Sequence, residues 1–447
     1  MKQYFILSMV TMLSGCQDSF LDVKPDKALV VPATLADYQA VLDNFDSMNS
    51  PGLSLIAGDE FTASAEQVQS WEYVERQAYL WADDLYSGAG SADWDVPYKA
   101  VFAANLVLEG AGKLSPGAEL SNLIGYAYFY RANAFFGLAQ QFAPPYEAGS
   151  ARSQLGIPLK LTTEVTRTVA RASLFDTYQQ ILADLQQAAE LITAESIWKN
   201  RPSRAAVFAL LARVQLAMGD YESAGKSASA SLALSGKLVD FNDLDPGAKM
   251  SFPHSPKDAN QEVLYYNRMN FYLFFFTPYY QVDSSLYASY GPDDLRKQCY
   301  FDTLSDGTVW YKGSYAGSFG FFSGLATDEV YLTRAECYAR QGRTGQALSD
   351  LNALLVKRFK KGTFNPLTAA SAEQALRLVI AERKKELVAR GLRWADLRRL
   401  NREEAFKTTL RRRFDGKEYV LFPGSPRYTF PIPPNELSGS GIQQNPR

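Results

Sequence analysis

The feature that most constrains the fold is a repeated spacing of small residues in two helix-forming segments. Each segment has Ala, Gly and Ala separated by seven and then five residues: Ala212, Gly219 and Ala224, and later Ala335, Gly342 and Ala347. Tetratricopeptide helix pairs have such a pattern, because alanine lets two helices approach closely and glycine forms the turn between them. The spacing therefore predicts stacked helix pairs, with generic helical hairpins as the alternative.

Apolar residues at helical spacing predict a mainly α fold. Thr34 should begin an amphipathic helix through Leu42 and Met48, and Pro144 and Pro145 should end a long helix. Other helices are expected at residues 93–113, 119–142, 173–192, 203–234, 326–358 and 371–390. We expect the helices at 116–142, 173–192, 203–234 and 326–358 to stack into a solenoid, with 371–390 packed beside it.

Two segments, about 58–95 and 236–325, differ in composition from the helical part. They are irregular and rich in aromatic residues, including the run from Tyr265 to Tyr280, and the second also holds five prolines. We expect loops and short elements that lie over the scaffold. Repeat scaffolds leave specific contacts to such inserted loops, so ligand-binding residues are expected here.

The first sixteen residues have the layout of a secretory signal. Lys2 precedes an apolar run from Tyr4 to Leu13 that is too short to span a bilayer, and Ser14, Gly15 and Cys16 follow. This order resembles a bacterial lipobox, so we expect residues 1–15 to be a lipoprotein signal peptide and Cys16 to carry the lipid. An ordinary signal with a chance cysteine is the alternative. Residues 16–447 are expected to form a single domain.

Charge and histidine content argue against two classes of function. The formal net charge is −2, and basic residues are mixed with acidic ones except at Arg411–Arg413, which we interpret as a solvated helix face. Nucleic acid is therefore not an expected partner. The single histidine, His254, lies in a Pro-rich loop that would not orient it as a general base. We expect no enzyme activity.

Cysteine and acidic residues predict no metal centre and no cofactor. Cys299 and Cys337 are expected to be free, because Cys337 lies in a helical segment where a thiol packs as a small hydrophobe. No spacing matches a zinc site. Two aspartate pairs lack the spacing of a calcium loop and are expected in surface turns: Asp243 with Asp245, and Asp302 with Asp306.

Several motifs occur in a fixed order over nearly the whole chain. They are Phe20–Pro25 after Cys16, Tyr98–Asn105 with Tyr126–Ala132, Glu329–Tyr338 with Asp350–Asn352, Glu382–Arg399, and Pro431–Glu436 with Gln443–Pro446. In this order and spacing the chain resembles the SusD/RagB-like nutrient-binding lipoproteins of Bacteroidetes. It departs from the family pattern at Ala132, Asn133 and Ala395, which are packing variations.

The resemblance implies a SusD-like, tetratricopeptide-type helical-repeat scaffold with loop-rich insertions. It implies a lipid-anchored protein of the cell outer membrane, facing the cell surface, that captures oligosaccharides and delivers them to a SusC-like TonB-dependent transporter. Two alternatives stay open: a RagB-like protein that binds peptides, and a lid whose main partner is the transporter. The sequence does not identify the glycan.

Aromatic side chains in the irregular segments are the expected ligand contacts. Sugar rings stack their apolar C–H faces on Trp and Tyr, while a few polar side chains orient the hydroxyl groups. The expected contacts are Trp81, Asp83, Asp84, Tyr272, Tyr279, Tyr280, Trp310 and Tyr311. Burial against the scaffold is the alternative for each of them. The run Phe274–Phe276 could be core or could contact the transporter.

Acidic and basic residues are dense between Glu382 and Arg399. Glu382, Glu386 and Arg390 are one helical turn apart, a spacing at which ion pairs form within a helix. Glycoside hydrolysis needs two carboxylates on either side of one bond, which neighbours on a single helix face do not supply. We interpret these residues as a structural network that holds the last helix to the repeats.

Overall fold

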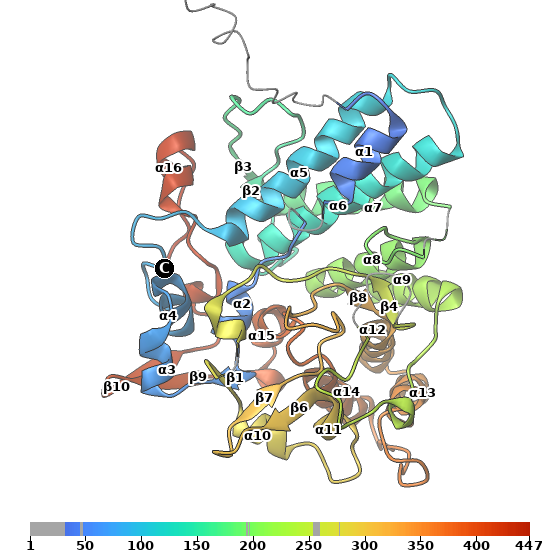
Figure 1. Ribbon diagram of the computed structural model, residues 1–447, viewed down its shortest axis with the longest axis vertical. Coiled ribbons are helices and arrows are strands. Elements are labelled where there is room, and N and C mark those ends of the chain that lie inside the picture. Colours follow the sequence, from blue (N-terminus) through green and yellow to red (C-terminus); the bar gives the residue numbers. More distant parts are fainter. Residues whose placement is uncertain (1–31, 45–47, 194, 196, 254–259, 277) are drawn as a thin grey trace, which may run out of the picture.

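The computed structural model describes residues 32–44, 48–193, 195, 197–253, 260–276 and 278–447 (Figure 1). Cys16, the Phe20–Pro25 motif and His254 lie outside these ranges.

The structure is mainly helical, which confirms the predicted fold class. The α-helices are α1 (Leu35–Leu42), α2 (Leu53–Ala57), α3 (Ala65–Ser70), α4 (Tyr73–Tyr79), α5 (Ala92–Ala111), α6 (Ala118–Phe142), α7 (Leu174–Leu191), α8 (Arg204–Met218), α9 (Tyr221–Leu234), α10 (Ser284–Ala288), α11 (Arg296–Tyr300), α12 (Thr327–Arg340), α13 (Thr344–Leu355), α14 (Ala372–Glu386), α15 (Arg393–Leu400) and α16 (Pro434–Ser440). Short 3-10 turns are η3 (Phe241–Asp243), η4 (Leu273–Phe275), η5 (Glu404–Phe406) and η6 (Pro426–Tyr428).

The strands form antiparallel pairs. These are β1 (Phe61–Thr62) with β5 (Gln281–Val282), β2 (Leu155–Pro158) with β3 (Arg171–Ser173), β4 (Val263–Tyr265) with β8 (Leu325–Ala326), β6 (Phe301–Thr303) with β7 (Val309–Tyr311), and β9 (Leu410–Phe414) with β10 (Lys417–Leu421).

The scaffold consists of successive helix hairpins. α5 packs on α6 and α6 on α7, α8 pairs with α9, and α12 pairs with α13 and packs on both α9 and α14. Figure 1 shows α5, α6 and α7 at the top, α8 and α9 below them, and α12, α13 and α14 lower still. Gly219 and Gly342 lie at the hairpin turns with φ of +77° and +75°. The two turn glycines predicted from the repeat are confirmed.

Helix ends follow local sequence signals. The Thr34 hydroxyl accepts from the Asp37 N–H at 3.2 Å, and the Asp37 carboxylate accepts from the Thr34 N–H at 2.9 Å, which makes a capping box. α1 ends at Leu42, however, and does not continue to Met48. The chain leaves the helix at Asp43, whose carboxylate pairs with Arg201 at 2.6 Å.

The two irregular segments lie side by side. Phe61 pairs with Val282 across β1 and β5, which joins residues 58–95 to residues 236–325. Both segments contain short helices, α3 and α4 in the first and α10 and α11 in the second. Most of their aromatic residues belong to the same large hydrophobic core as the scaffold helices. One such contact is between Phe129 of α6 and Tyr265 of β4, with ring centroids 4.8 Å apart.

The Arg411–Arg413 triplet is not a solvated helix face. It lies on β9, where alternate side chains point to opposite sides, and Arg412 is buried. The Arg412 guanidinium donates to backbone carbonyls of Ile56, Gly58 and Tyr79. The interpretation was wrong because a three-residue charge run does not distinguish helix from strand.

Cys299 and Cys337 are free and fully buried, as expected. Burial raises the pKa of Cys299 to about 11 and that of Cys337 to about 12, so both thiols stay protonated at neutral pH. In the part of the chain that the structure describes, we find no helix long and apolar enough to cross a membrane. The same residues contain no group of three or more His, Cys, Asp or Glu side chains placed to hold a metal ion.

Candidate ligand-binding site

Trp81, an expected ligand contact, is a core residue in the structure. It is 3% exposed, and its indole N–H donates to the Ala57 carbonyl at 3.0 Å. The Arg412 guanidinium lies 4.5 Å from its ring centroid. The ring therefore supports the fold and has no open face on which a sugar could stack.

Asp83 and Asp84 are exposed beside it. Asp83 pairs with Arg427 at 2.9 Å. Asp84 accepts from the backbone N–H groups of Tyr86 and Ser87 at 2.9 and 3.0 Å. Because Trp81 is buried, these carboxylates do not adjoin an open tryptophan face.

Tyr280 and Tyr311 are buried together. The Tyr280 hydroxyl accepts from the Tyr311 N–H at 3.2 Å and lies 3.3 Å from the Tyr311 carbonyl, to which it donates. Burial raises the pKa of both side chains. Trp310 precedes Tyr311 on β7 and remains partly exposed, since neighbouring strand residues face opposite sides.

Tyr272 and Tyr279 are partly exposed and fixed by hydrogen bonds. The Tyr272 hydroxyl donates to Asp93 at 2.9 Å. The Tyr279 carbonyl accepts from the Trp71 indole N–H at 3.0 Å. The Trp71 ring contacts Tyr79, which stacks in turn on the Arg412 guanidinium beside Trp81. The structure thus connects the expected contacts near Trp81 with those on the loop at Tyr279. Three of the eight expected contacts are buried: Trp81, Tyr280 and Tyr311.

Two exposed residues outside the eight expected ligand contacts lie on the same loop. One of them, Phe276, ends the run Phe274–Phe276, in which Phe274 and Phe275 are core residues. Phe271 is 55% exposed and Phe276 is 37% exposed, and their rings pack edge to face with centroids 4.7 Å apart. We call residues 271–276 and 278–280 the aromatic ridge. The sequence signal for exposed rings was the density of aromatic residues. Seven of the ten residues from Phe271 to Tyr280 are aromatic, which is more than a loop of this length readily buries.

Aromatic packing supports the ridge from below. Phe275 stacks on Phe321 with centroids 4.7 Å apart and an interplanar angle of 7°. Phe274 packs edge to face on Phe61 of β1 at 5.8 Å and on Trp71 at 5.2 Å. The exposed rings of the ridge therefore lie above tightly packed aromatic side chains.

One buried carboxylate, that of Asp93 at the start of α5, fixes the base of the ridge. Asp93 is fully buried. Its oxygens accept hydrogen bonds of 2.8–3.0 Å from the Gly52 and Leu53 N–H groups, the Gln141 and Asn270 side-chain amides, and the Tyr272 hydroxyl. Charge-assisted bonds to a buried carboxylate are strong, so Asp93 ties the ridge to α2, α5 and α6.

Residues of α3 and α4 hold the other side of the ridge. Glu75 is fully buried and accepts from the Phe274 N–H at 3.1 Å and the Glu72 N–H at 3.0 Å. Burial raises the pKa of Glu75. The Gln67 side-chain amide donates to the Pro278 carbonyl. The ridge is therefore bonded on one side through the Tyr272 hydroxyl and on the other through its backbone. A surface that is already fixed loses less conformational entropy when it binds a ligand.

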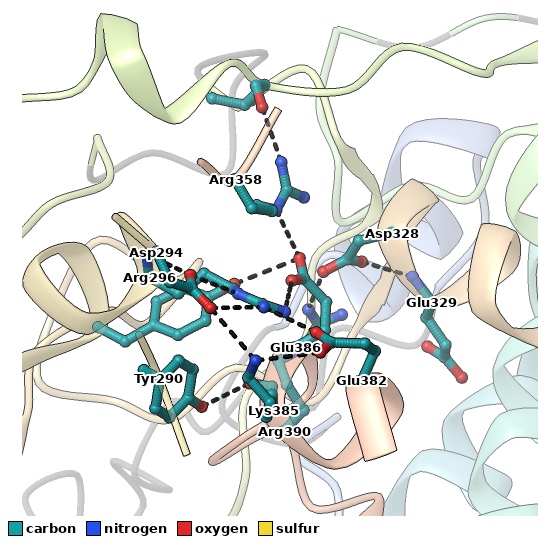
Figure 2. A network of polar contacts seen from close by, with 12 residues as sticks. Tyr290, Asp294, Arg296, Asp328, Glu329, Arg358, Glu382, Lys385, Glu386 and Arg390 are labelled. Atoms are coloured by element: carbon teal, nitrogen blue, oxygen red, sulfur yellow. Dashed lines mark hydrogen bonds and ion pairs between the residues drawn. The ribbon is translucent and has the colours of Figure 1, made fainter. Parts of the chain in front are cut away.

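The charged residues expected to form a network do so, and mostly across elements. Glu386 accepts from Arg358 at 2.7 Å and from Arg296 at 3.0 Å, and all three side chains are fully buried (Figure 2). Arg296 also pairs with Asp294 and Glu382, each at 2.7 Å.

The pairing within one helix that the spacing suggested is replaced by tertiary pairing. Arg390 pairs with Asp328 at 3.1 Å, not with Glu386 (Figure 2). Arg383 pairs with Asp396 at 2.8 Å. These carboxylates already accept from guanidinium groups inside the protein, so they are not a pair of free acids across a cleft.

Comparison with known proteins agrees with this architecture. A family model described as "Starch-binding associating with outer membrane" matches residues 19–216, and a model of the SusD family matches residues 327–447. SusD-like protein P2 of Formosa agariphila is 27% identical over 243 residues, or 51% of this chain. The match spans 46% of that relative, about half its length.

Solved structures with the same fold cover nearly the whole chain. A SusD superfamily protein from Bacteroides vulgatus has a TM-score of 0.75 at 22% identity, over 93% of this chain and 99% of its own. One from Bacteroides thetaiotaomicron has a TM-score of 0.74 at 20% identity, over 93% and 100%. A laminarin-binding SusD-like protein has a TM-score of 0.61 at 16% identity, over 92% and 99%.

The family models match both the first scaffold helices and the last, which carry the motifs that pointed to this family. The structural similarity covers the loop-rich segments between them. The chain belongs to the SusD family.

Proposed function

We propose that this chain captures oligosaccharides at the bacterial cell surface and delivers them to a SusC-like TonB-dependent transporter. It acts as a binding protein and not as an enzyme. The family description refers to starch binding and to the outer membrane, and one relative of the same fold is named for laminarin binding. The observation that carries the proposal is the pair of exposed rings, Phe271 and Phe276, on a ridge bonded from both sides.

The ridge has the chemistry that a sugar requires. Exposed aromatic faces take up the apolar C–H faces of sugar rings, and partly exposed Tyr272 and Tyr279 stand beside them. Trp310, Asp83 and Asp84 are the other expected contacts that keep exposed surface. We assign stacking to Phe271 and Phe276, and contacts with sugar hydroxyl groups to Tyr279.

The test is a panel of neutral oligosaccharides measured by calorimetry against the soluble protein from residue 17. We expect Phe271→Ala and Phe276→Ala each to lower the affinity for the tightest-binding oligosaccharide about three- to tenfold. An aromatic contact contributes about 0.5–1.5 kcal/mol to binding. Phe102→Ala is the matched control, since Phe102 is 41% exposed on the scaffold helix α5. It should leave affinity unchanged.

Two outcomes would contradict the proposal. Binding of peptides by a protein that takes no oligosaccharide would favour the RagB-like alternative. Equal affinity in wild type, Phe271→Ala and Phe276→Ala would exclude the ridge as the site.

We further propose that the protein is anchored by lipid on Cys16. In cells, Cys16→Ala should release the protein from the membrane fraction, because no thiol remains at the signal-peptide junction. Mass spectrometry of the wild-type N-terminal peptide should show acyl chains on Cys16. An unlipidated peptide starting elsewhere would exclude the anchor.

A further inference from the structure

A pocket that shares no lining residue with the ridge lies between residues 144–171 and the C-terminal part of the chain. Its volume is about 440 Å³, within the range of small-ligand pockets. The walls come from the turn after α6, from β2 and β3, from the end of α15, and from residues 424–429 and 443–446. We call it the C-terminal pocket.

The side chains that line it carry an excess of positive charge. Arg171, Arg398 and Arg402 are basic, and Glu147 is the acidic residue among the lining positions. Glu147 pairs with Arg402 at 2.7 Å, and both are largely exposed. Two guanidinium groups, those of Arg171 and Arg398, are therefore not balanced by a carboxylate of the pocket wall.

Arg398 is buried at 4% exposure and bonded to neutral groups. Its two terminal nitrogens donate to the backbone carbonyls of Gln140 and Ala143. Its Nε is buried without a hydrogen-bond partner among the described residues. A buried cation normally has an anionic partner, because desolvation is costly without one.

Arg171 has the same type of surroundings. Its Nε donates to the Gly156 carbonyl at 2.8 Å, and its terminal nitrogens donate to carbonyls of Gln443, Leu155 and Phe142. Burial lowers the pKa of both Arg171 and Arg398 to about 10. Both remain cationic at neutral pH.

The other buried arginines show how unusual this is. Among the described residues, six of eight buried arginines have a carboxylate partner: Arg131, Arg213, Arg296, Arg358, Arg383 and Arg390. The seventh, Arg412, stacks on Tyr79 with its guanidinium carbon 3.6 Å from the ring centroid. Arg398 is the eighth, and it lines a pocket large enough to admit an anion.

A neighbouring acceptor is suited to a ligand that also carries hydroxyl groups, because an amide oxygen accepts from O–H donors and cannot bond an oxyanion. The Oε1 of Gln154, another lining residue, is buried without a hydrogen-bond partner among the described residues. The pocket wall thus has two polar side chains, Gln154 and Arg398, with unused hydrogen-bonding capacity. Groups of this kind are costly to bury unless something else satisfies them.

We propose that the C-terminal pocket binds a carboxylate or sulfate group carried by an acidic saccharide, held by Arg171 and Arg398. A guanidinium group presents parallel N–H donors that fit both oxyanions. The saccharide part rests on the proposed function of the chain. It gives the protein a charge-selective subsite in addition to the stacking surface.

The test compares a neutral sugar, glucose, with its acidic derivatives glucuronate and glucose 6-sulfate, and with inorganic sulfate as an anion without a sugar ring. Each is titrated into the protein by calorimetry or NMR. We expect glucuronate or glucose 6-sulfate to bind at least tenfold more tightly than glucose, and added NaCl to weaken that binding. Both should also bind more tightly than inorganic sulfate, because the pocket has room for the ring.

Two variants of different kinds keep the test independent of folding. Arg171→Gln removes one half-buried charge and should reduce affinity for the acidic probe at least tenfold. Gln154→Glu places a carboxylate of the same shape among the arginines, so it should abolish binding of the acidic probe while raising the melting temperature. Arg411→Gln removes an exposed charge on β9 and should change neither the affinity for the acidic probe nor the melting temperature.

The outcomes separate this inference from the proposed function. Equal affinity for glucose and its acidic derivatives, or unchanged affinity in Arg171→Gln, would overturn the charged subsite even if neutral oligosaccharides bind the ridge. Binding of inorganic sulfate as tightly as glucose 6-sulfate would overturn the saccharide assignment. Acidic-probe binding that survives Phe271→Ala but is lost in Arg171→Gln would support the pocket independently of the ridge.

Discussion

Two adjacent carboxyl groups, those of Asp59 and Glu60, show how strongly surroundings set the state of a residue here. Burial opposes the charge of Asp59, but Arg393 and Lys384, at 2.7 and 2.9 Å, hold its pKa well below the usual range. Burial raises the pKa of Glu60 to about 8, and the negative charge of Asp59 adds to the effect. Among the described residues, the Glu60 carboxyl group accepts a single hydrogen bond, from the Ala389 N–H at 3.2 Å.

Glu60 should therefore destabilise the fold as pH rises. Its folded pKa lies above its unfolded value of about 4.3, so the stability linked to its bound proton is present below pH 4 and is lost as pH rises towards 8. We expect Glu60→Gln to match wild type in thermal unfolding near pH 4 and to exceed it by a few kcal/mol at pH 8.5. Glu373→Gln, at an exposed pair with Arg377, should show no such gain. A Glu60→Gln variant no more stable than wild type at pH 8.5 would contradict the raised pKa.

Residue exposure was the part of the site that the sequence predicted least well. Trp81 and Phe271 both lie in irregular segments, where no helical or strand periodicity separates an inner from an outer face. Trp81 has φ of +53° and turns its indole towards Ala57, a long-range bond that no local pattern indicates. The sequence therefore pointed to the segments that carry the proposed site but did not identify which rings are exposed.

At the scale of helices, local chemistry predicted much more. The capping box at Thr34 and the stop at Pro144 identified helix ends because both act through neighbouring backbone groups. The turn glycines were predictable for the same reason, since a left-handed φ favours glycine. The pairings of β1 with β5 and of Arg390 with Asp328 were not, because each joins residues far apart in the chain.

Two exposed glycines three residues apart test the role of the hairpin turns. Gly342 has φ of +75° at the turn between α12 and α13, and a Cβ there would meet no atom within 4 Å. Gly342→Ala should thus lose about 1 kcal/mol of unfolding free energy through backbone strain alone. Gly345 lies in the first turn of α13 with equal space for a Cβ, and Gly345→Ala should gain about 0.5 kcal/mol. Chemical denaturation measures both, and effects of the same sign would contradict the account of the turn.

At the scale of the whole molecule, buried ion pairs join the C-terminal helices to the irregular segments. Arg296 of α11 pairs with Glu382 and Glu386 of α14 (Figure 2). Arg358 pairs with Glu262 beside β4. This network holds the loop-rich segment that carries the ridge against the helical scaffold.

Arg296→Met should cost about 3–5 kcal/mol of unfolding free energy, because Asp294, Glu382 and Glu386 would lose a buried positive partner. Arg377→Met is the control, since its pair with Glu373 is exposed and contributes less than about 1 kcal/mol. Urea unfolding compares the two. A cost for Arg296→Met as small as that for Arg377→Met would show that the network does not hold the segments together.

We propose that the ridge captures the oligosaccharide that the cell takes up. The most direct measurement is uptake of the bound oligosaccharide by cells carrying the Phe271→Ala/Phe276→Ala variant, with surface amounts matched to wild type. We expect slower uptake at low oligosaccharide concentration and wild-type uptake at saturating concentration, because more ligand compensates for a weakened capture site. Unchanged uptake at every concentration would contradict capture at the ridge and favour a lid that acts on the transporter alone.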